Sequence, residues 1–274
     1  MPILKDIAQV LRVFEQGNTS LVVVLLGHRL GQFRIHAKGV RRWSKKGFEG
    51  GLDLLTRGEI LVYSRHGEGL WILREWDERV RPRLGKNLEL LRAASYLCEF
   101  AEALTRPTAG SIVELAAAPA GERSNAQLYD LLASATDALA KGNTIGLVLL
   151  SFTLGALQTG GLLPDFRVCS SCGRKFERDR RSIWLTSAGV RCESCHRVTR
   201  KLPIREPEER SVELSPEAHG VISHVAKTSR PVRVSANAAE QLAHALILLV
   251  HGALEHDLRT LLSAAHMVRA MGLQ

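Results

Sequence analysis

The chain has 274 residues, which is long enough to bury a core in two domains or in one domain with an insertion. Its formal net charge of +9 and its pI near 9.7 suit a polyanionic partner without naming one. It contains no run of roughly 18 uncharged apolar residues, and residues 1–6 lack the order of a secretion signal, so we expect a soluble cytosolic protein, neither membrane-spanning nor exported.

The positive charge is concentrated in two segments. Residues 28–48 have seven cationic side chains and no acidic one, and residues 167–205 have eleven cationic side chains against three acidic ones. The rest of the chain therefore has a net charge of −6. A solvated, salt-bridged loop would normally interleave acids with its cations, and these segments do so very little.

The first 76 residues show the pattern of β-strands. "AQVLRVF" (8–14) and "SLVVVLLG" (20–27) are of strand length, and "QFRIHAK" (32–38) alternates with a period of two. "EILVYSR" and "LWILREW" flank the turn "HGEG", which predicts a hairpin from Glu59 to Trp76. About five strands in so short a segment predict a small closed or half-closed barrel.

The apolar spacing then changes to that of helices. A first helix is predicted over 87–105, with Asn87 as its cap and an apolar pattern at Leu88, Leu91, Tyr96, Leu97, Phe100 and Leu104. A second helix is predicted to begin at Ser124 and to end at Gly142. Residues 144–158 are apolar on nearly all sides, which predicts a central helix that ends at Gly160 and Gly161.

The remainder of the chain is also predicted to be helical. Ser215 followed by Pro216 predicts another helix start, and residues 236–270 fit one long helix or two short ones. The sequence thus predicts an α+β fold, with a barrel over residues 1–80 and a helical domain over residues 81–274. An insertion at about residues 165–206 interrupts the helical domain and contains most of the cysteines.

Four cysteines form two C-x-x-C pairs, in "CSSCG" and "RCESC": Cys169, Cys172, Cys192 and Cys195. Two intervening residues let both sulfurs of a pair face one ion at about 2.3 Å, and two pairs complete a tetrahedral thiolate shell. Gly173 allows the positive φ that such a turn needs. We therefore expect the four cysteines to bind one structural Zn²⁺ rather than to form disulfides or a thioredoxin-like redox pair. Four thiolates leave no open coordination position, so this ion is not expected to be catalytic.

Two further residues, His196 and Cys98, are of a type that can bind metal but are not expected to do so here. His196 follows Cys195 and could be imagined as a substitute ligand, but histidines in this position are mostly exposed. Cys98 lies on the apolar side of its predicted helix, which favours core packing over any chemistry.

Several classes of enzyme find no support in the sequence. It contains no G-x-x-x-x-G-K-[ST] phosphate-binding loop, no H-x-E motif combined with P-C-x-x-C, and no G-x-S-x-G nucleophile elbow. The ten histidines are scattered along the chain. We therefore expect a protein that is not an enzyme.

The basic segment around residue 40 fits a nucleic-acid surface. Phe33, Ile35 and Ala37 should face one side of a strand and Arg34, His36 and Lys38 the other. Side chains on one face lie about 6.6 Å apart, close to the phosphate spacing of an extended strand of nucleic acid. The alternative is a solubilising face. The cations continue along the chain as Arg41, Arg42, Lys45 and Lys46.

Two other features extend this interpretation. Trp43 could stack on a base or, equally, close one end of the barrel. The insertion adds candidate DNA contacts at Arg174, Arg180 and Arg181. The two basic regions are predicted to form one continuous or bipartite track for DNA.

The residues at this point resemble a known family. "QVLRVFEQGNTSLVVVLLGHRLGQFRIHAKGVRR" is similar to the start of the bacterial RecO recombination-repair proteins, including a K-G-x-R-R signature at Lys38, Gly39, Arg41 and Arg42. "LLPDFRVCSSCG" and "SAGVRCESC" resemble the approach to the family's zinc module and its second cysteine pair. The resemblance spans roughly residues 8–200, whereas residues 203–235 and the last helices match only in general character.

The resemblance implies an N-terminal OB barrel, a helical domain and a zinc-ribbon-like insertion. It implies a bacterial cytoplasmic, nucleoid-associated protein that binds single- and double-stranded DNA and anneals complementary strands. Its implied partners are RecR, single-strand-binding protein, RecA and in some pathways RecF. DNA contacts would lie on the basic barrel face, at Arg34, Lys38, Arg41 and Arg42, and more weakly at Lys45 and Lys46.

Two other functions remain open from the residues themselves. A zinc-ribbon module of the transcription or translation machinery would use the basic ribbon to contact RNA or a protein. An uncharacterised hydrolase would need metal-dependent turnover, which a saturated thiolate site disfavours. Annealing of complementary oligonucleotides without ATP separates both from a DNA-binding mediator.

Overall fold

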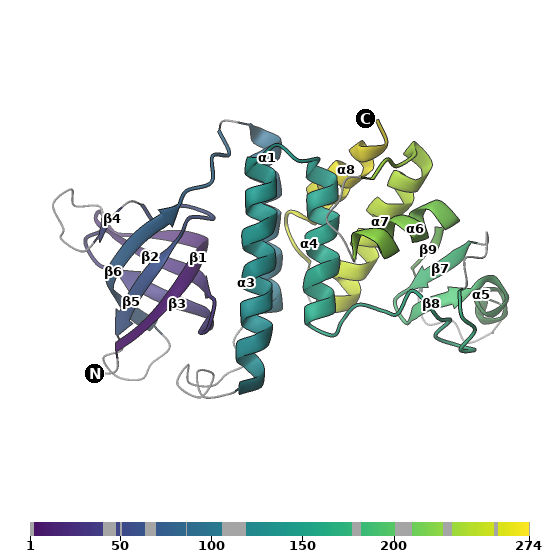
Figure 1. Cartoon of the computed structure of the whole chain (residues 1–274), viewed down its shortest axis with the longest axis horizontal. Helices are drawn as coiled ribbons and strands as arrows, with labels where there is room; N and C mark the ends of the chain where they lie inside the picture. Colours follow the sequence, from purple (N-terminus) through teal and green to yellow (C-terminus); the bar gives the residue numbers. More distant parts are fainter. Residues whose placement is uncertain are drawn as a thin grey trace. The chain divides into compact units, whose positions relative to one another are not determined.

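A computed structural model describes the chain over residues 3–40, 48–49, 51–63, 70–85, 87–105, 119–176, 182–200, 210–226, 232–254 and 257–273 (Figure 1). The chain divides into two compact units, Met1–Lys141 and Gly142–Gln274. The predicted domain boundary near residue 80 stays a prediction. Among the described residues, no helix combines the length and the apolar character that crossing a bilayer requires.

The first unit contains a closed barrel. Its strands are β1 (Ile3–Gln16), β2 (Ser20–Gly27), β3 (Gly31–Ala37), β4 (Phe48–Glu49), β5 (Arg57–Tyr63) and β6 (Leu70–Val80). Their order in the sheet is β3-β2-β1-β5-β6-β4, and a parallel pairing of β3 with β6 closes the sheet on itself. This connectivity fits an OB fold and confirms the predicted five-strand barrel, to which the two-residue strand β4 is added.

The alternation predicted for β3 is confirmed. Phe33, Ile35 and Ala37 are buried in the barrel interior, where Trp71 and Trp76 of β6 also lie. Arg34 and Lys38 point outward and are exposed, whereas His36 is half-buried. Because β3 has a neighbour on each side, its backbone is fixed in the sheet and its cations project from a rigid surface.

Two helices of the first unit pack against this barrel, α1 (Leu88–Leu104) and α3 (Pro119–Ala140). Polar contacts fix them to β1: Gln9 Nε2 donates to Thr136 Oγ1 at 3.0 Å, and Arg12 pairs with Glu102 at 2.8 Å. An Arg57–Asp137 ion pair ties α3 to β5. These contacts are long-range in sequence and hold both helices on the outer side of the sheet.

The predicted limits of these helices are partly correct. The Asn87 side chain caps α1 by accepting from the backbone N–H of Glu89 at 2.9 Å, as predicted. Ser124 does not cap α3, because that helix begins five residues earlier, at Pro119. Leu88 and Leu91 are exposed at 59% and 40%, so the buried face of α1 begins only at Ala93.

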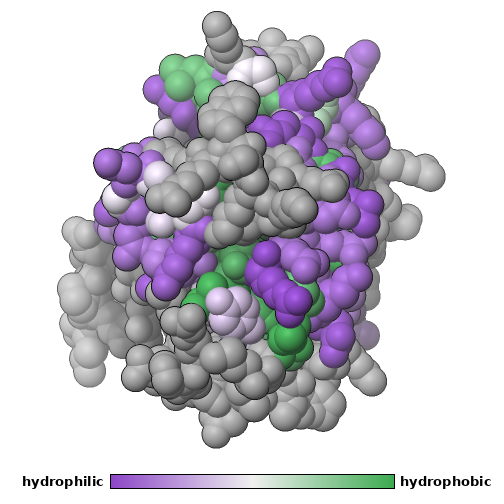
Figure 2. Space-filling model, turned by 90° about the vertical axis from the view of Figure 1, so that its left-hand side faces the viewer, coloured by the Kyte–Doolittle hydropathy of each residue, from purple (hydrophilic) through white to green (hydrophobic). Residues whose placement is uncertain are grey.

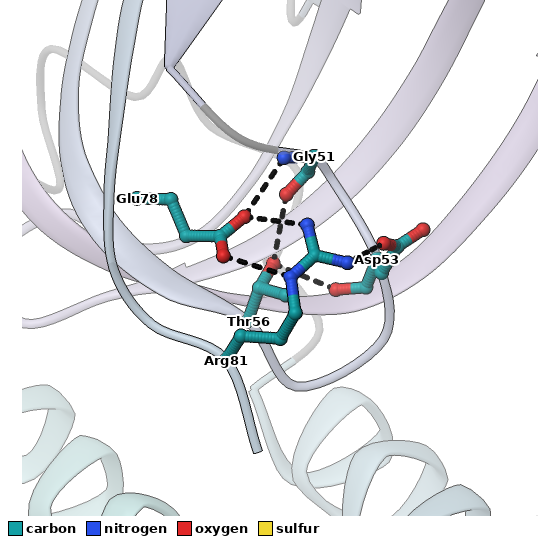
Figure 3. Close-up of polar contacts among 5 residues, drawn as sticks. All are labelled: Gly51, Asp53, Thr56, Glu78 and Arg81. Atoms are coloured by element: carbon teal, nitrogen blue, oxygen red, sulfur yellow. Dashed lines mark hydrogen bonds and ion pairs between the residues drawn. The ribbon is translucent and has the colours of Figure 1, made fainter. Parts of the chain in front are cut away.

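A polar network holds the segment that leads into β5 against the end of β6 (Figure 3). Arg81 donates through Nε and Nη2 to the two carboxylate oxygens of Glu78, at 2.8 and 2.7 Å, and through Nη1 to Asp53 at 2.6 Å. The backbone N–H of Gly51 donates to Glu78 at 2.8 Å, and Thr56 Oγ1 donates to the carbonyl of Asp53 at 2.8 Å. The network therefore fixes the end of the strand that closes the barrel.

This network predicts a small pH-dependent stability. Hydrogen bonds from Arg81 lower the pKa of Glu78 below its usual value. The carboxylate therefore contributes stability above its unfolded pKa, and the contribution is lost as pH falls through its folded pKa. Because Arg81 is half exposed, we expect its pairing with Glu78 to contribute less than about 1 kcal/mol to the free energy of unfolding. Urea unfolding should show wild type more stable than Glu78→Gln at neutral pH, with the gap closing as the pH falls below the usual pKa range of a glutamate; a gap independent of pH would contradict the prediction.

The second unit contains α4 (Ile145–Thr159), α6 (Pro216–Val225), α7 (Ala236–Ala253), α8 (Leu261–Arg269) and the 3₁₀ helix η1 (Ala270–Leu273). Helix α4 is buried on most sides and ends at Gly160, as predicted. The Ser215 hydroxyl caps α6 by accepting from Ala218 N at 3.3 Å, as predicted. Residues 236–270 form two helices rather than one.

The same unit carries a small sheet beside a short helix. Its strands are β7 (Ile183–Thr186), β8 (Gly189–Cys192) and β9 (Ser211–Leu214), in the order β8-β7-β9, and α5 (Glu193–Arg200) follows β8. β9 comes from beyond residue 206, so the sheet recruits a strand outside the expected insertion.

Candidate metal centre and nucleic-acid interface

The first cysteine pair lies in a tight turn between two short extended segments. Val168 and Lys175 form an isolated bridge across the turn, and Cys169 N donates to the carbonyl of Arg174 at 2.8 Å. Gly173 adopts a φ of 70° and donates its N–H to the carbonyl of Cys169 at 2.9 Å. The predicted need for glycine at this position is thus confirmed, because a side chain is strained at such a φ.

The second pair is placed by a hairpin and the helix that follows it. β7 and β8 pair in antiparallel register, with Ile183 opposite Cys192. Cys192 is the last residue of β8, and Cys195 lies in the first turn of α5. Ser170 N donates to the carbonyl of Val190 at 2.8 Å, which joins the first turn to the hairpin. Local backbone pairing therefore brings the two cysteine pairs face to face.

The four sulfurs converge on one point. The Sγ atoms of Cys169, Cys172, Cys192 and Cys195 all lie within 4.8 Å of one another, and Cys172 Sγ is 3.9 Å from Cys192 Sγ. A tetrahedral shell with Zn–S bonds of about 2.3 Å places its sulfurs roughly 3.8 Å apart. The cluster could therefore bind one metal ion, and a four-thiolate donor set suits Zn²⁺.

The cluster also favours the charged form of one ligand. Burial alone would raise the pKa of the Cys169 thiol, but backbone N–H groups of Cys192, Cys172 and Ser171 donate to its sulfur and lower that pKa to about 6. The bond from Cys192 N measures 3.4 Å. Thiolate is the form that ligates metals, so the backbone prepares this sulfur for an ion.

His196 differs from its predicted exposed position. Its ring is buried at 5% exposure and stacks on Trp184 of β7, with ring centroids 4.1 Å apart and planes within 4°. Trp184 lies on the central strand of the sheet, so the stack fixes the first turn of α5 against β7. Such a cross-element aromatic contact supports the geometry around Cys195 without His196 serving as a ligand.

Polar and aromatic contacts join the cysteine turn to α6. His219 shares a 2.8 Å hydrogen bond between its Nε2 and the carbonyl of Phe166, and its ring also contacts Phe176 edge-on. Ser215 N donates to Gln241 of α7 at 2.9 Å, directly after β9. The cysteine cluster is therefore supported by the helices of its own unit. The scattered positions of the histidines in the sequence give no reason to expect this role for His219, which depends on the distant rings of Phe166 and Phe176.

The predicted DNA-binding residues fall into two groups. Arg34, Lys38 and Arg174 are exposed, and the first two occupy outward positions on and after β3, on either side of His36. The others lie outside the residues that the structure describes, as does Trp43: Arg41, Arg42, Lys45, Lys46, Arg180 and Arg181. The roles of all nine in DNA binding stay predictions. Cys98, by contrast, is buried at 3%, and burial raises the pKa of its thiol, which confirms core packing.

A buried carboxylate that sequence reasoning missed positions the turn before β3. Asp6 is only 5% exposed and accepts from the backbone N–H groups of Arg29 and Leu30 at 3.1 and 2.9 Å. Burial raises the pKa of Asp6, while these hydrogen bonds oppose that rise. The turn it holds sets where β3 begins, and with it the register of Arg34. An acid at an inward position of an apolar strand was the only signal in the sequence.

Comparison with known proteins finds a family and several relatives that match this chain. The family described as "Recombination protein O C terminal" matches residues 85–262, which is more than half of the chain. A DNA repair protein RecO from Rhodopirellula baltica is 34% identical over 191 residues, covering 69% of this chain and 65% of that protein, just under two thirds of its length.

Other relatives carry the same description. A DNA repair protein RecO from Anaeromyxobacter sp. strain K is 29% identical over 71% of this chain and 72% of its own length. One from Dehalococcoides mccartyi strain BAV1 is 27% identical over 73% of each chain. The chain belongs to the RecO family of DNA repair proteins.

Proposed function

We propose that this protein is a non-enzymatic mediator of DNA repair and recombination that binds single- and double-stranded DNA and anneals complementary strands. It acts in the bacterial cytoplasm, on the nucleoid. With RecR it helps RecA to load onto single strands coated with single-strand-binding protein, with RecF as a possible further partner. The family membership carries this proposal, and that family is not a recognised class of enzyme.

The charge distribution gives the proposal a physical basis. Two DNA strands repel each other, and a surface that neutralises phosphates on both lowers that repulsion while released counterions drive binding. Arg34 and Lys38 offer two cations on a rigid outer surface, and the residues that follow in the chain add Arg41, Arg42, Lys45 and Lys46. Base pairing between the strands then supplies sequence recognition, so annealing needs no energy source.

We further propose that the four cysteines hold one structural Zn²⁺. The donor set, the spacing of the sulfurs and the lowered pKa of Cys169 support a metal there. The ion would fix the turn that presents Arg174, whereas Arg180 and Arg181 lie outside the described residues. It would leave no open coordination position and would supply no chemical step.

Annealing of complementary oligonucleotides without ATP tests the proposal. We expect the protein to accelerate annealing, and its affinity for a single strand to fall steeply with salt, with a log–log slope on the order of −5 if about seven phosphates are contacted. Arg34→Glu with Lys38→Glu should slow annealing and flatten that slope, whereas the matched pair Lys5→Glu and Arg79→Glu, which replaces cations that pair with Glu59, should do so less. A flat salt response in the wild type would refute it.

A further inference from the structure

Six outward-facing side chains form one continuous row across the barrel strands. Each is the direct partner of the next in the strand register, from β1 through β2, β3, β6 and β5 and back to β1. The members are Phe14, Val22, His36, Ile72, Tyr63 and Ile3, and we call them the apolar row.

The apolar row lies on the surface rather than in a core. Ile3 is 50% exposed and Phe14 is 45% exposed, and the four members between them are half-buried. Farther along β2, by contrast, the outward residue Val24 is fully buried. Figure 2 looks onto the barrel from the side that is on the left in Figure 1, and it shows apolar side chains exposed between hydrophilic ones.

Cations flank this row along the strands. Arg34 and Lys38 lie two residues to either side of His36. The Arg12 guanidinium lies over the Phe14 ring, 5.8 Å from its centroid. Arg12 pairs with Glu102, whereas Arg34 makes no ion pair with any residue that the structure describes. At least one cation beside the row is therefore available for a phosphate.

The histidine in the row is an aromatic surface rather than a cation. Burial, and then the charge of Lys38, lowers the pKa of His36 below its usual value. The imidazole is therefore neutral at physiological pH. The side chains of His36, Ile72 and Tyr63 lie next to one another on neighbouring strands, which are about 4.8 Å apart. Each of the three presents a flat or apolar surface.

From this arrangement we infer that the apolar row, centred on Tyr63, Ile72 and His36, is a platform on which unpaired bases of a single strand stack. The inference rests on the proposed function and names the site that prefers single strands. A row one residue wide with cations beside it matches bases flanked by phosphates. A protein interface would instead bury a broader apolar centre, and a duplex keeps its bases stacked inside.

The test compares a DNA strand whose bases are free to stack with DNA whose bases are absent or already paired. Binding of wild type and Tyr63→Ala would be measured on oligothymidylate, on an abasic strand of the same length and on a duplex. We expect Tyr63→Ala to bind oligothymidylate on the order of tenfold more weakly, because about one stacked base is lost, with little change on the abasic strand or duplex. Tyr63→Phe keeps the ring and should retain wild-type affinity. Lys38→Ala should weaken the binding of all three ligands.

Ile7→Ala provides the matched control, because Ile7 is 43% exposed on β1 and faces Glu59 rather than a member of the row. Equal affinities of Tyr63→Ala and Ile7→Ala for oligothymidylate would overturn the inference while leaving DNA binding intact. An equal loss on abasic and base-bearing strands would also overturn it, as would a change of oligomeric state without a change of affinity. If wild type bound no single strand, the inference and the proposed function would fail together.

Discussion

Replacing Cys172 by serine is expected to abolish stoichiometric metal binding and to open the turn and hairpin around it. Structural zinc sites contribute on the order of 10 kcal/mol to the folding of the segments they join. Residues 170–175, the turn around Cys172, are exposed, so backbone pairing alone should not hold this turn in place. The barrel lies in the other compact unit and should remain folded.

Metal content of the purified protein and limited proteolysis across residues 165–214 would measure this effect. Cys98→Ala is the matched control, since Cys98 is a cysteine buried in the first unit and should leave the metal in place. A strong zinc chelator added to wild type should reproduce the protease sensitivity of Cys172→Ser. If Cys172→Ser retained one equivalent of metal and wild-type protease resistance, the assignment of that ligand would be wrong.

A second large effect is expected where α4 crosses α8. Gly146 has no side chain there, and a Cβ at this position would lie 2.4 Å from the carbonyl oxygen of Met267 and 2.8 Å from Val268 Cα. Backbone atoms cannot yield as a flexible side chain can, so Gly146→Ala must push the two helices apart. We expect a loss of about 1–3 kcal/mol in the free energy of unfolding.

A matched substitution should have the opposite sign. Gly220 lies within α6, is exposed, and has no neighbouring atom within 4 Å of an added Cβ. Gly220→Ala should therefore stabilise the helix by about 0.5–1 kcal/mol through the lower backbone entropy of the unfolded chain. Urea unfolding followed by far-ultraviolet circular dichroism would compare both variants with wild type. Changes of the same sign in both would contradict the close approach of α4 and α8.

Local patterns predicted the parts of the fold that depend on neighbouring residues. The alternation at Phe33, Ile35 and Ala37 predicts β3 correctly because side-chain direction in a strand has a period of two. The spacing of the cysteine pairs predicts their convergence because both pairs are placed by local backbone structure, the first by the turn at Gly173 and the second by the β7–β8 hairpin and the start of α5. The cap at Asn87 was predictable for the same local reason.

Long-range contacts account for the errors. Ser124 has the chemistry of a cap, yet α3 continues through it from Pro119, which a local cap preference does not reveal. His196 is buried because Trp184 of the adjacent hairpin covers it. The apolar row could not be predicted, because it depends on the pairing register between residues that are far apart in the sequence, such as Ile3 and Tyr63. Nothing in the sequence sets its members apart from their neighbours, and only strand pairing aligns them.

The pairing of β7 with β9 limits how this protein can be divided for study. β7 is the middle strand of its sheet, with Ile183 opposite Cys192 on one side and opposite Leu214 on the other. A fragment cut at residue 206 would keep all four thiols but leave one side of β7 bare, with unsatisfied amides that invite self-association. Any autonomous metal-binding peptide derived from this chain must therefore extend through Leu214.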